Sequence, residues 1–178
     1  ILGIMPIFHG FGLGVSVHTC FMSGMCCILV PQFKAKEFSK LIKRNKPDFL
    51  AGVPTMYEAL INCEEKNKNY LKNVKNVICG GDVLNEALRD RVDKYLKSYG
   101  SEARIRVGYG LTECTGASCL TPKYYYKEGG IGIPFPDTLY KIVKIDSTEE
   151  VKVNEPGEIC INGPTVMMRY LNDSSATK

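Results

Sequence analysis

Two short glycine-containing stretches carry the side chains best suited to chemistry in this chain. Residues 80–84 read Gly-Gly-Asp-Val-Leu, and residues 108–113 read Gly-Tyr-Gly-Leu-Thr-Glu. Glycines let backbone N–H groups approach a phosphate or a purine edge without a clash from a Cβ atom. Tyr109 offers a flat face for a base, the Thr112 hydroxyl can donate to a phosphate oxygen, and Glu113 is a hard oxygen ligand for Mg²⁺. Together these groups suit a nucleoside triphosphate with its metal.

The same strings are also ordinary turn sequences. Gly-Gly-Asp and Gly-Tyr-Gly are common in turns, and Tyr109 could be a core residue. Thr112 could cap a helix that has Glu113 in its first turn. Residue types and spacing alone leave both interpretations open.

Other catalytic and metal-binding patterns are missing from the sequence. Residues 10–15 resemble a dinucleotide fingerprint, but Val15 stands where its third glycine belongs. The chain has no G-x-S-x-G or H-E-x-x-H pattern and no C-x-x-C pair, and its two histidines, His9 and His18, stand apart. These absences argue against a nicotinamide site, a hydrolase nucleophile and a zinc cage.

Strands and helices alternate along the first two thirds of the chain. Helical spacing of apolar residues, with capping residues at the ends, predicts helices at about 10–23, 36–45, 54–61 and 85–100. Apolar runs predict strands at 1–5, 26–30, 49–53, 74–79 and 104–107. This order is typical of an α/β protein with an open, mostly parallel sheet and helices on both faces. Ligands of such sheets bind outside the carboxyl ends of the strands, so we expect residues 80–84 and 108–113 to face one crevice.

The sequence changes character after Pro122. Turn residues and short β-branched runs at 131–133, 139–145 and 158–162 predict antiparallel strands in a small β-rich, barrel-like unit. We therefore divide the chain into an α/β subdomain at 1–122 and a β-rich subdomain at 123–178, truncated at its C-terminal end. The chain starts without Met or a charged leader and stops in a polar stretch, which we interpret as a piece of a longer protein.

Composition and charge limit the class of protein. The chain has 178 residues, 44% hydrophobic and 24% charged, which favours a packed globular core over disorder or a coiled coil. The net charge of +4 is spread along the chain, so no nucleic acid partner is implied. Residues 7–30 are long and apolar enough to span a membrane, but their glycines and histidines and the lack of flanking anchors argue against stable insertion. The eight cysteines lie mostly in apolar runs, as reduced core thiols do, and predict a cytoplasmic protein.

Five motifs, in order along the chain, resemble those of the adenylate-forming (AMP-binding) superfamily of acyl-CoA synthetases, luciferases and peptide-synthetase adenylation domains. Residues 109–113, Tyr-Gly-Leu-Thr-Glu, resemble its Y-G-x-T-E signature. The other four are its P-x-F-H segment at 6–12, V-P-x at 53–56, G-G-x-x-L at 80–84, and G-E-I-x-x-x-G-P with G-Y-x-N at 157–164 and 168–172. The chain thus resembles an internal fragment of the large N-terminal domain in the acyl-CoA synthetase, or acid–thiol ligase, branch.

The resemblance implies a role for each matching position. Thr112 would contact the α-phosphate that the acid's carboxylate attacks, and Glu113 would bind Mg²⁺. His9 would lie between the acyl pocket and the thiol tunnel; the alternative is a buried histidine bonded to the backbone. Tyr109 would stack on adenine. The residues implied to contact the nucleotide are Gly81, Asp82, Val83, Gly108, Tyr109, Gly110 and Thr112.

The implied reaction joins a carboxylic acid to ATP, releasing pyrophosphate, and then transfers the acyl group to coenzyme A. Mg²⁺ would assist the first step, and the apolar residues 1–30 with Val107 favour an apolar acyl chain. Two alternatives stay open: an acyl-AMP ligase or adenylation domain that delivers to a carrier protein, and a non-catalytic nucleotide-binding module. The family's phosphate loop, ribose aspartate and catalytic lysine have no counterpart in these residues, so we expect the piece alone to be inactive. The protein could also form a homodimer.

Overall fold

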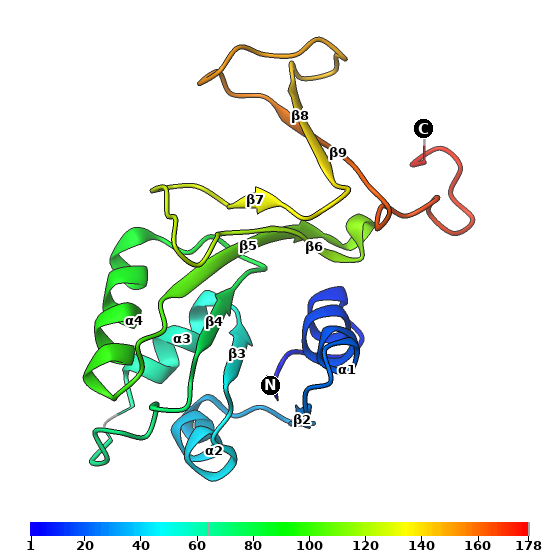
Figure 1. The fold of residues 1–178 in the computed structure, drawn as a ribbon. Helices are drawn as coiled ribbons and strands as arrows, with labels where there is room; N and C mark the ends of the chain where they lie inside the picture. The colour runs from blue at the N-terminus through cyan, green and yellow to red at the C-terminus, as the bar shows by residue number, and fades with distance from the viewer. Residues whose placement is uncertain (64, 178) are drawn as a thin grey trace.

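The central feature of the computed structural model, which describes residues 1–63 and 65–177, is a seven-stranded sheet (Figure 1). Strand order across the sheet is β2-β1-β3-β4-β5-β6-β7. The pairs from β2 to β5 are parallel, whereas β6 and β7 are added antiparallel. The predicted open, mostly parallel sheet is therefore confirmed. Its strands are β1 (Leu2–Gly3), β2 (Ile28–Leu29), β3 (Phe49–Gly52), β4 (Asn76–Cys79), β5 (Ile105–Leu111), β6 (Gly116–Leu120) and β7 (Ile133–Pro134).

Helices cover both faces of this sheet, as predicted. Successive side chains of a strand point to opposite faces, so Leu2 and Leu50 join the core under α2, α3 and α4, whereas Ile1 and Ala51 pack with Phe11 on the other face. The predicted helix at 10–23 is present there as a π-helical segment followed by a short α-helix. The helices are η1 (Phe11–His18), α1 (Thr19–Met22), η2 (Ala35–Glu37), α2 (Phe38–Asn45), α3 (Pro54–Ile61) and α4 (Glu86–Ser98).

Tyr57 ties α3 to the sheet. Its ring is fully buried, and its hydroxyl donates to the Ile78 carbonyl oxygen at 2.7 Å. We expect Tyr57→Phe to lower the free energy of unfolding of the 178-residue chain by about 1–2 kcal/mol, because a buried carbonyl loses its donor. Urea denaturation measures this, with Tyr125→Phe at an exposed position as the control. Equal midpoints for the two variants would show that the hydroxyl contributes nothing.

Strand β5 is longer than the sequence predicted. The apolar run indicated a strand at 104–107 followed by a loop, but β5 continues to Leu111. The cause is β6, which turns back after η3 (Thr112–Cys114) and pairs with the second half of β5. Gly108, Tyr109 and Gly110 therefore lie in a paired strand rather than in a loop.

The residues after Pro122 form antiparallel strands that are divided between two sheets. β7 extends the large sheet beyond residue 122, while β8 (Leu139–Val143) and β9 (Glu158–Asn162) pair as a separate two-stranded sheet. In Figure 1 this hairpin projects away from the large sheet, and the C-terminal residues lead away from it. The division into subdomains at residue 122 stays a prediction.

Two further expectations concern the apolar segments. All eight cysteines are free thiols, and Cys20, Cys79, Cys114 and Cys119 are buried. Residues 7–30 form helices and one strand of the sheet. Within residues 1–63 and 65–177, no helix is both long and apolar enough to cross a membrane.

Candidate functional site

The two glycine-containing stretches lie side by side at the carboxyl ends of β4 and β5, next to Phe11. A Cβ atom added at Gly80 would lie 3.0 Å from the Gly108 carbonyl oxygen and 3.7 Å from the Phe11 ring. One added at Gly81 would lie 3.4 Å from the Val53 side chain and 4.0 Å from the Phe11 ring. Segments from four of the five motifs noted in the sequence, around residues 11, 53, 80 and 108, therefore meet at this edge of the sheet.

The turn after β4 displays residues 82 and 83 at this edge. Gly81 has φ +79°, a conformation that favours glycine, and the buried Leu84 anchors the end of the turn. The Asp82 carboxylate accepts from the Val83 N–H at 2.7 Å, and both side chains are exposed, Val83 by 83%. An exposed valine beside a polar carboxylate gives this turn one apolar and one charged surface.

The β5–β6 hairpin holds Tyr109 half-buried rather than in the core. Tyr109 pairs with Cys119 and Gly110 with Ala117, so Ser118 is an extra residue on β6 and forms a bulge. The Ser118 hydroxyl donates to the Tyr109 carbonyl oxygen at 3.2 Å. A Cβ atom at Gly110 would lie only 1.7 Å from the Gly116 carbonyl oxygen, so packing within the hairpin requires glycine here.

The turn of the hairpin carries Thr112 and Glu113. Thr112 is exposed, and its side chain makes no capping bond in η3, which argues against the interpretation of Thr112 as a helix cap. The Glu113 carboxylate accepts from the Tyr170 hydroxyl at 2.6 Å, and its carbonyl oxygen accepts from the Met167 N–H at 2.7 Å. The Thr115 hydroxyl donates to the Thr165 carbonyl oxygen at 2.9 Å. The fifth motif is thereby joined to the hairpin turn.

Tyr170 changes the acidity of Glu113. Its hydrogen bond stabilises the carboxylate, which lowers the pKa of Glu113 and raises the pKa of Tyr170. The stabilisation that the bond gives is present above the ordinary pKa of a glutamate and is lost as the pH falls through the lowered value. Tyr170 therefore orients one oxygen of the Glu113 carboxylate and keeps the group ionised to a lower pH than an unperturbed glutamate.

We expect Tyr170→Phe to raise the pKa of Glu113 toward its ordinary value, because the carboxylate loses its donor. A carboxyl-carbon NMR titration measures this directly. Tyr124→Phe, at an exposed position elsewhere, is the control and leaves the Glu113 titration unchanged. An unaltered Glu113 pKa in Tyr170→Phe would show that the bond does not form in solution.

His9 is exposed, so the alternative of a buried histidine is wrong, although its ring does bond the backbone. The Phe11 N–H donates to His9 Nδ1 at 3.0 Å, which leaves the proton of the neutral ring on Nε2. A Cβ atom at Gly10 would lie 3.3 Å from the Gly116 nitrogen, so this segment rests against the β5–β6 turn. The place of His9 between an acyl pocket and a thiol tunnel stays a prediction.

Two residues important to this geometry were not singled out from the sequence. Phe11 is the common neighbour of the glycine turn, and Tyr170 bonds Glu113 across 57 positions of sequence. Both lie within motif stretches, at 6–12 and 168–172. A search of those stretches for a donor to Glu113 could have pointed to Tyr170, but no local pattern marks Phe11.

Glu113 is the side chain of this site that could act as a metal ligand. The part of the chain that the structure describes contains no cluster of three or more His, Cys, Asp or Glu side chains able to hold a metal. Mg²⁺ commonly takes only one or two carboxylates and completes its shell with water and phosphate oxygens. A single accessible carboxylate therefore fits Mg²⁺ that arrives with a phosphate, and does not fit a metal caged by protein alone.

Comparisons with known proteins show which family this sequence resembles. The sequence model described as "AMP-binding enzyme" matches residues 1–171. A probable 4-coumarate–CoA ligase 3 of Dictyostelium discoideum is 30% identical over 177 residues, 99% of this chain and 32% of the relative. Luciferin 4-monooxygenase of Photinus pyralis is 31% identical over 177 residues, 99% of this chain and 31% of the relative. The chain thus spans about a third of the length of these curated relatives.

The fold is shared with solved structures. A long-chain-fatty-acid–CoA ligase from Archaeoglobus fulgidus superposes with a TM-score of 0.90 at 23% identity, covering 99% of this chain and 36% of that one. The family match extends over nearly all of the described residues and includes every motif that meets at the sheet edge. This chain belongs to the AMP-binding enzyme family.

Proposed function

We propose that this chain is the central part of an ATP-dependent acyl-CoA synthetase. Such an enzyme forms acyl-AMP and pyrophosphate from an acid and ATP, and then transfers the acyl group to coenzyme A. The observation that carries the proposal is that segments of four motifs lie together at one edge of the sheet, and that Tyr170 of the fifth motif bonds Glu113 in the adjoining hairpin turn. The similarity to a 4-coumarate–CoA ligase supports the acid–thiol branch.

In this proposal the adenine lies between the Tyr109 ring and the glycine turn. The half-buried ring supplies one face, and the backbone of residues 81–83, with the exposed Val83 side chain, supplies the other. Gly108 contributes its backbone, which lies directly beside Gly80. Gly110 contributes to the adenine site only indirectly, because its lack of a side chain lets β5 and β6 pair closely.

Thr112 and Glu113 act on the phosphates in this proposal. The exposed Thr112 hydroxyl donates to the α-phosphate and orients it for attack by the acid's carboxylate. Glu113 would hold Mg²⁺ together with phosphate oxygens, with its carboxylate kept ionised and oriented by Tyr170. The metal would offset the negative charge that accumulates on the phosphates during the reaction.

His9 and its neighbours provide the side of the site for the acid. The His9 Nε2–H, left free by the backbone bond at Nδ1, can donate a hydrogen bond to the carboxylate of an incoming acid. Ile7, Phe8 and Leu13 flank it, and all are more than half exposed, Phe8 by 93%. This apolar surface supports an acid with an apolar acyl chain.

The test uses the full-length protein that contains this chain, with a panel of carboxylic acids. Pyrophosphate release is measured with ATP, with and without coenzyme A, and products are identified by mass spectrometry. We expect release to depend on an apolar acid, and acyl-CoA to appear when coenzyme A is present. Release without acyl-CoA would point instead to delivery to a carrier protein, and no acid-dependent release would point to a non-catalytic nucleotide-binding module.

Three further expectations belong to this proposal. The chain spans about a third of its curated relatives, so we propose that these 178 residues alone do not complete the reaction. The free thiols of the eight cysteines support a reducing, cytoplasmic location. A homodimer stays a prediction that sedimentation of the full-length protein would test.

A further inference from the structure

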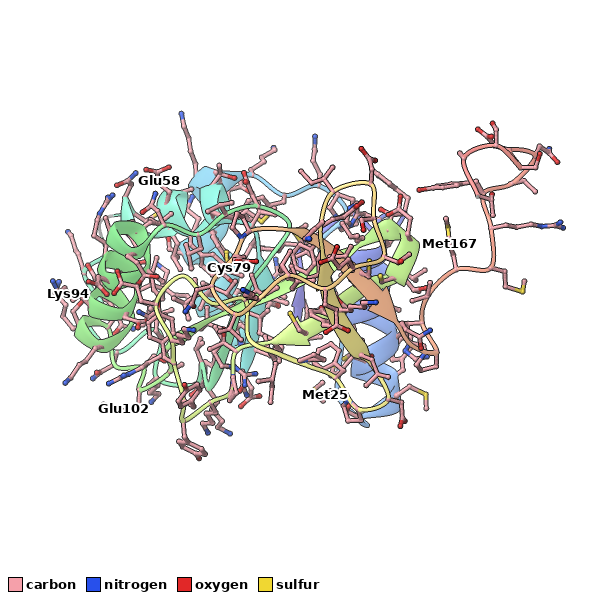
Figure 2. The ribbon with its side chains drawn as sticks, turned by 90° about the horizontal axis from the view of Figure 1, so that it is seen from above. Met25, Glu58, Cys79, Lys94, Glu102 and Met167 are labelled. Carbon is pink, nitrogen blue, oxygen red and sulfur yellow. The ribbon has the colours of Figure 1, made fainter. Side chains whose placement is uncertain are left out.

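A second polar groove, of about 370 Å³, lies at the opposite end of β5 from the candidate site. It is bounded by the first residues of β4 and β5, one side of α4 and the segment between β6 and β7. Glu102, at its edge, lies on the left in Figure 2, and Met167, whose N–H bonds Glu113, lies on the right, well apart from it. The lining includes Lys75, Arg89, Glu102, Arg104, Arg106, Lys123 and Tyr124 to Tyr126.

Positive charge dominates this groove. Five of its lining residues are Lys or Arg, whereas Glu102 is the single acid among them. Asp93 is also near, with one carboxylate oxygen accepting from the Ile105 N–H at 2.7 Å. Among the ion pairs of residues 1–63 and 65–177, none involves Arg104, Arg106 or Lys123. Lys75 and Arg89 are paired with Asp48 and Glu86, so within the described residues the cations of the groove without an ion pair are Arg104, Arg106 and Lys123.

Arg89, on the α4 side of the groove, has one buried donor that is not satisfied by any described residue. The residue is only 9% exposed, and its guanidinium carbon lies 3.3 Å from the centroid of the Tyr126 ring. Its Nη1 donates to Glu86 at 3.2 Å, but Nε is buried without a partner in the described part of the chain. Glu86 is itself already engaged, because it also accepts from the Tyr126 hydroxyl. An unmet buried donor of a cation is costly, so the charge of Arg89 beside the groove is only partly compensated.

Arg104 and Arg106 extend the same surface along the start of β5. Burial lowers the pKa of Arg106, which means that its guanidinium is partly removed from water. At the rim, Tyr124 and Tyr125 are 92% and 65% exposed and present hydroxyls and ring faces. Several guanidinium groups around one groove suit an anion with three or more oxygens, because each planar fork binds two of them.

We propose that this groove is a binding site for a phosphate or pyrophosphate group, either free or carried on a small molecule. The guanidinium groups of Arg104 and Arg106 supply the donors, and Arg89 and Lys123 add positive charge beside them. The site is separate from the nucleotide site, from which the length of β5, about 20 Å, divides it. This inference does not depend on the proposed synthetase activity.

The test is isothermal titration of the 178-residue chain with inorganic pyrophosphate. We expect one saturable site, weakened by about tenfold or more when Arg104→Gln and Arg106→Gln are combined. Arg91→Gln is the matched control, because it removes the same charge from an exposed position of α4 outside the groove. Arg104→Gln alone, at an exposed position, gives a second variant whose fold is checked by circular dichroism.

A third variant, Thr112→Ala, separates the two sites. Pyrophosphate binding that survives Thr112→Ala and is lost in the Arg104 and Arg106 variant supports the groove. Ribose 5-phosphate, a phosphate ester without adenine, is the second ligand that distinguishes the sources: comparable binding indicates a phosphate ester, and binding of pyrophosphate alone indicates the free anion. The proposal is overturned by no saturable binding, by equal losses in Arg91→Gln, or by binding that only Thr112→Ala removes.

Discussion

Glu113→Ala in the full-length protein is expected to slow acid-dependent exchange between pyrophosphate and ATP by on the order of 100-fold. The carboxylate is the group proposed to hold Mg²⁺ at the phosphates, where negative charge accumulates during adenylation. Because the hydrogen bond from Tyr170 already keeps Glu113 ionised and oriented, the loss comes from a prepared ligand rather than from a mobile surface carboxylate. Radiolabelled pyrophosphate exchange measures the effect without the thiol step.

Glu58→Ala is the matched control for this experiment. Glu58 is exposed on α3, and Figure 2 shows it away from Met167, which marks the Glu113 turn. Its removal changes the charge by the same amount and should leave exchange unaltered. Near-normal exchange in Glu113→Ala, with the control behaving as expected, would remove Glu113 from the proposed machinery.

The largest loss of stability is expected from Gly110→Ala. A Cβ atom there would lie 1.7 Å from the Gly116 carbonyl oxygen and 2.7 Å from the Ala117 Cα, and both obstacles are backbone. Relief requires the β5–β6 hairpin to separate, so the free energy of unfolding should fall by about 3 kcal/mol or more. Urea denaturation of the 178-residue chain gives the value, or soluble yield where the variant no longer folds.

Gly14→Ala provides the comparison. A Cβ atom at Gly14, within η1, would lie 3.5 Å from the Thr115 carbonyl oxygen, which is ordinary contact. Alanine is favoured over glycine in helices by up to about 1 kcal/mol, so this variant should be neutral or slightly stabilising. If Gly110→Ala unfolded at the same urea concentration as Gly14→Ala, the proposed close approach of Gly110 to the Gly116 backbone would be contradicted.

Elements whose signals are local were predictable from the sequence. Pro54 begins α3 as expected, and Asn85 caps α4 by accepting from the Leu88 N–H at 2.8 Å. The alternation of strand and helix predicted the parallel part of the sheet, because a helix between two strands lets the second strand run in the same direction as the first. The placement of residues 80–84 beside residue 108 followed from the rule that parallel strands end at one edge.

Features that depend on distant pairing were not predictable in this way. β5 continues through Gly108, Tyr109 and Gly110 because β6 pairs with it. The two glycines interrupt the apolar pattern, so apolar spacing does not predict a strand over these residues. The strand predicted at 131–133 joins the large sheet by pairing with β6, which its composition does not indicate. The contact of Tyr170 with Glu113 also depends on how distant segments fold together.

The glycines of the candidate site are required for different structural reasons. Gly81 adopts a positive φ that shapes the turn after β4, whereas Gly110 is required by the backbone of the opposite strand. From the sequence alone, we interpreted both glycines as positions where a ligand could approach the backbone. Hairpin packing does not require the exposure of the Val83 side chain, which leaves it available to a ligand.

Photolabelling of the full-length protein with 8-azido-ATP and Mg²⁺ tests most directly whether adenine binds between these two strand ends. The azide on the base reacts with whatever lies against it, and peptide mapping identifies the labelled residues. The account predicts labelling of Tyr109 or of residues 80–84, prevented by excess unmodified ATP. Labelling only at other positions, or labelling at these positions that ATP does not prevent, would contradict it.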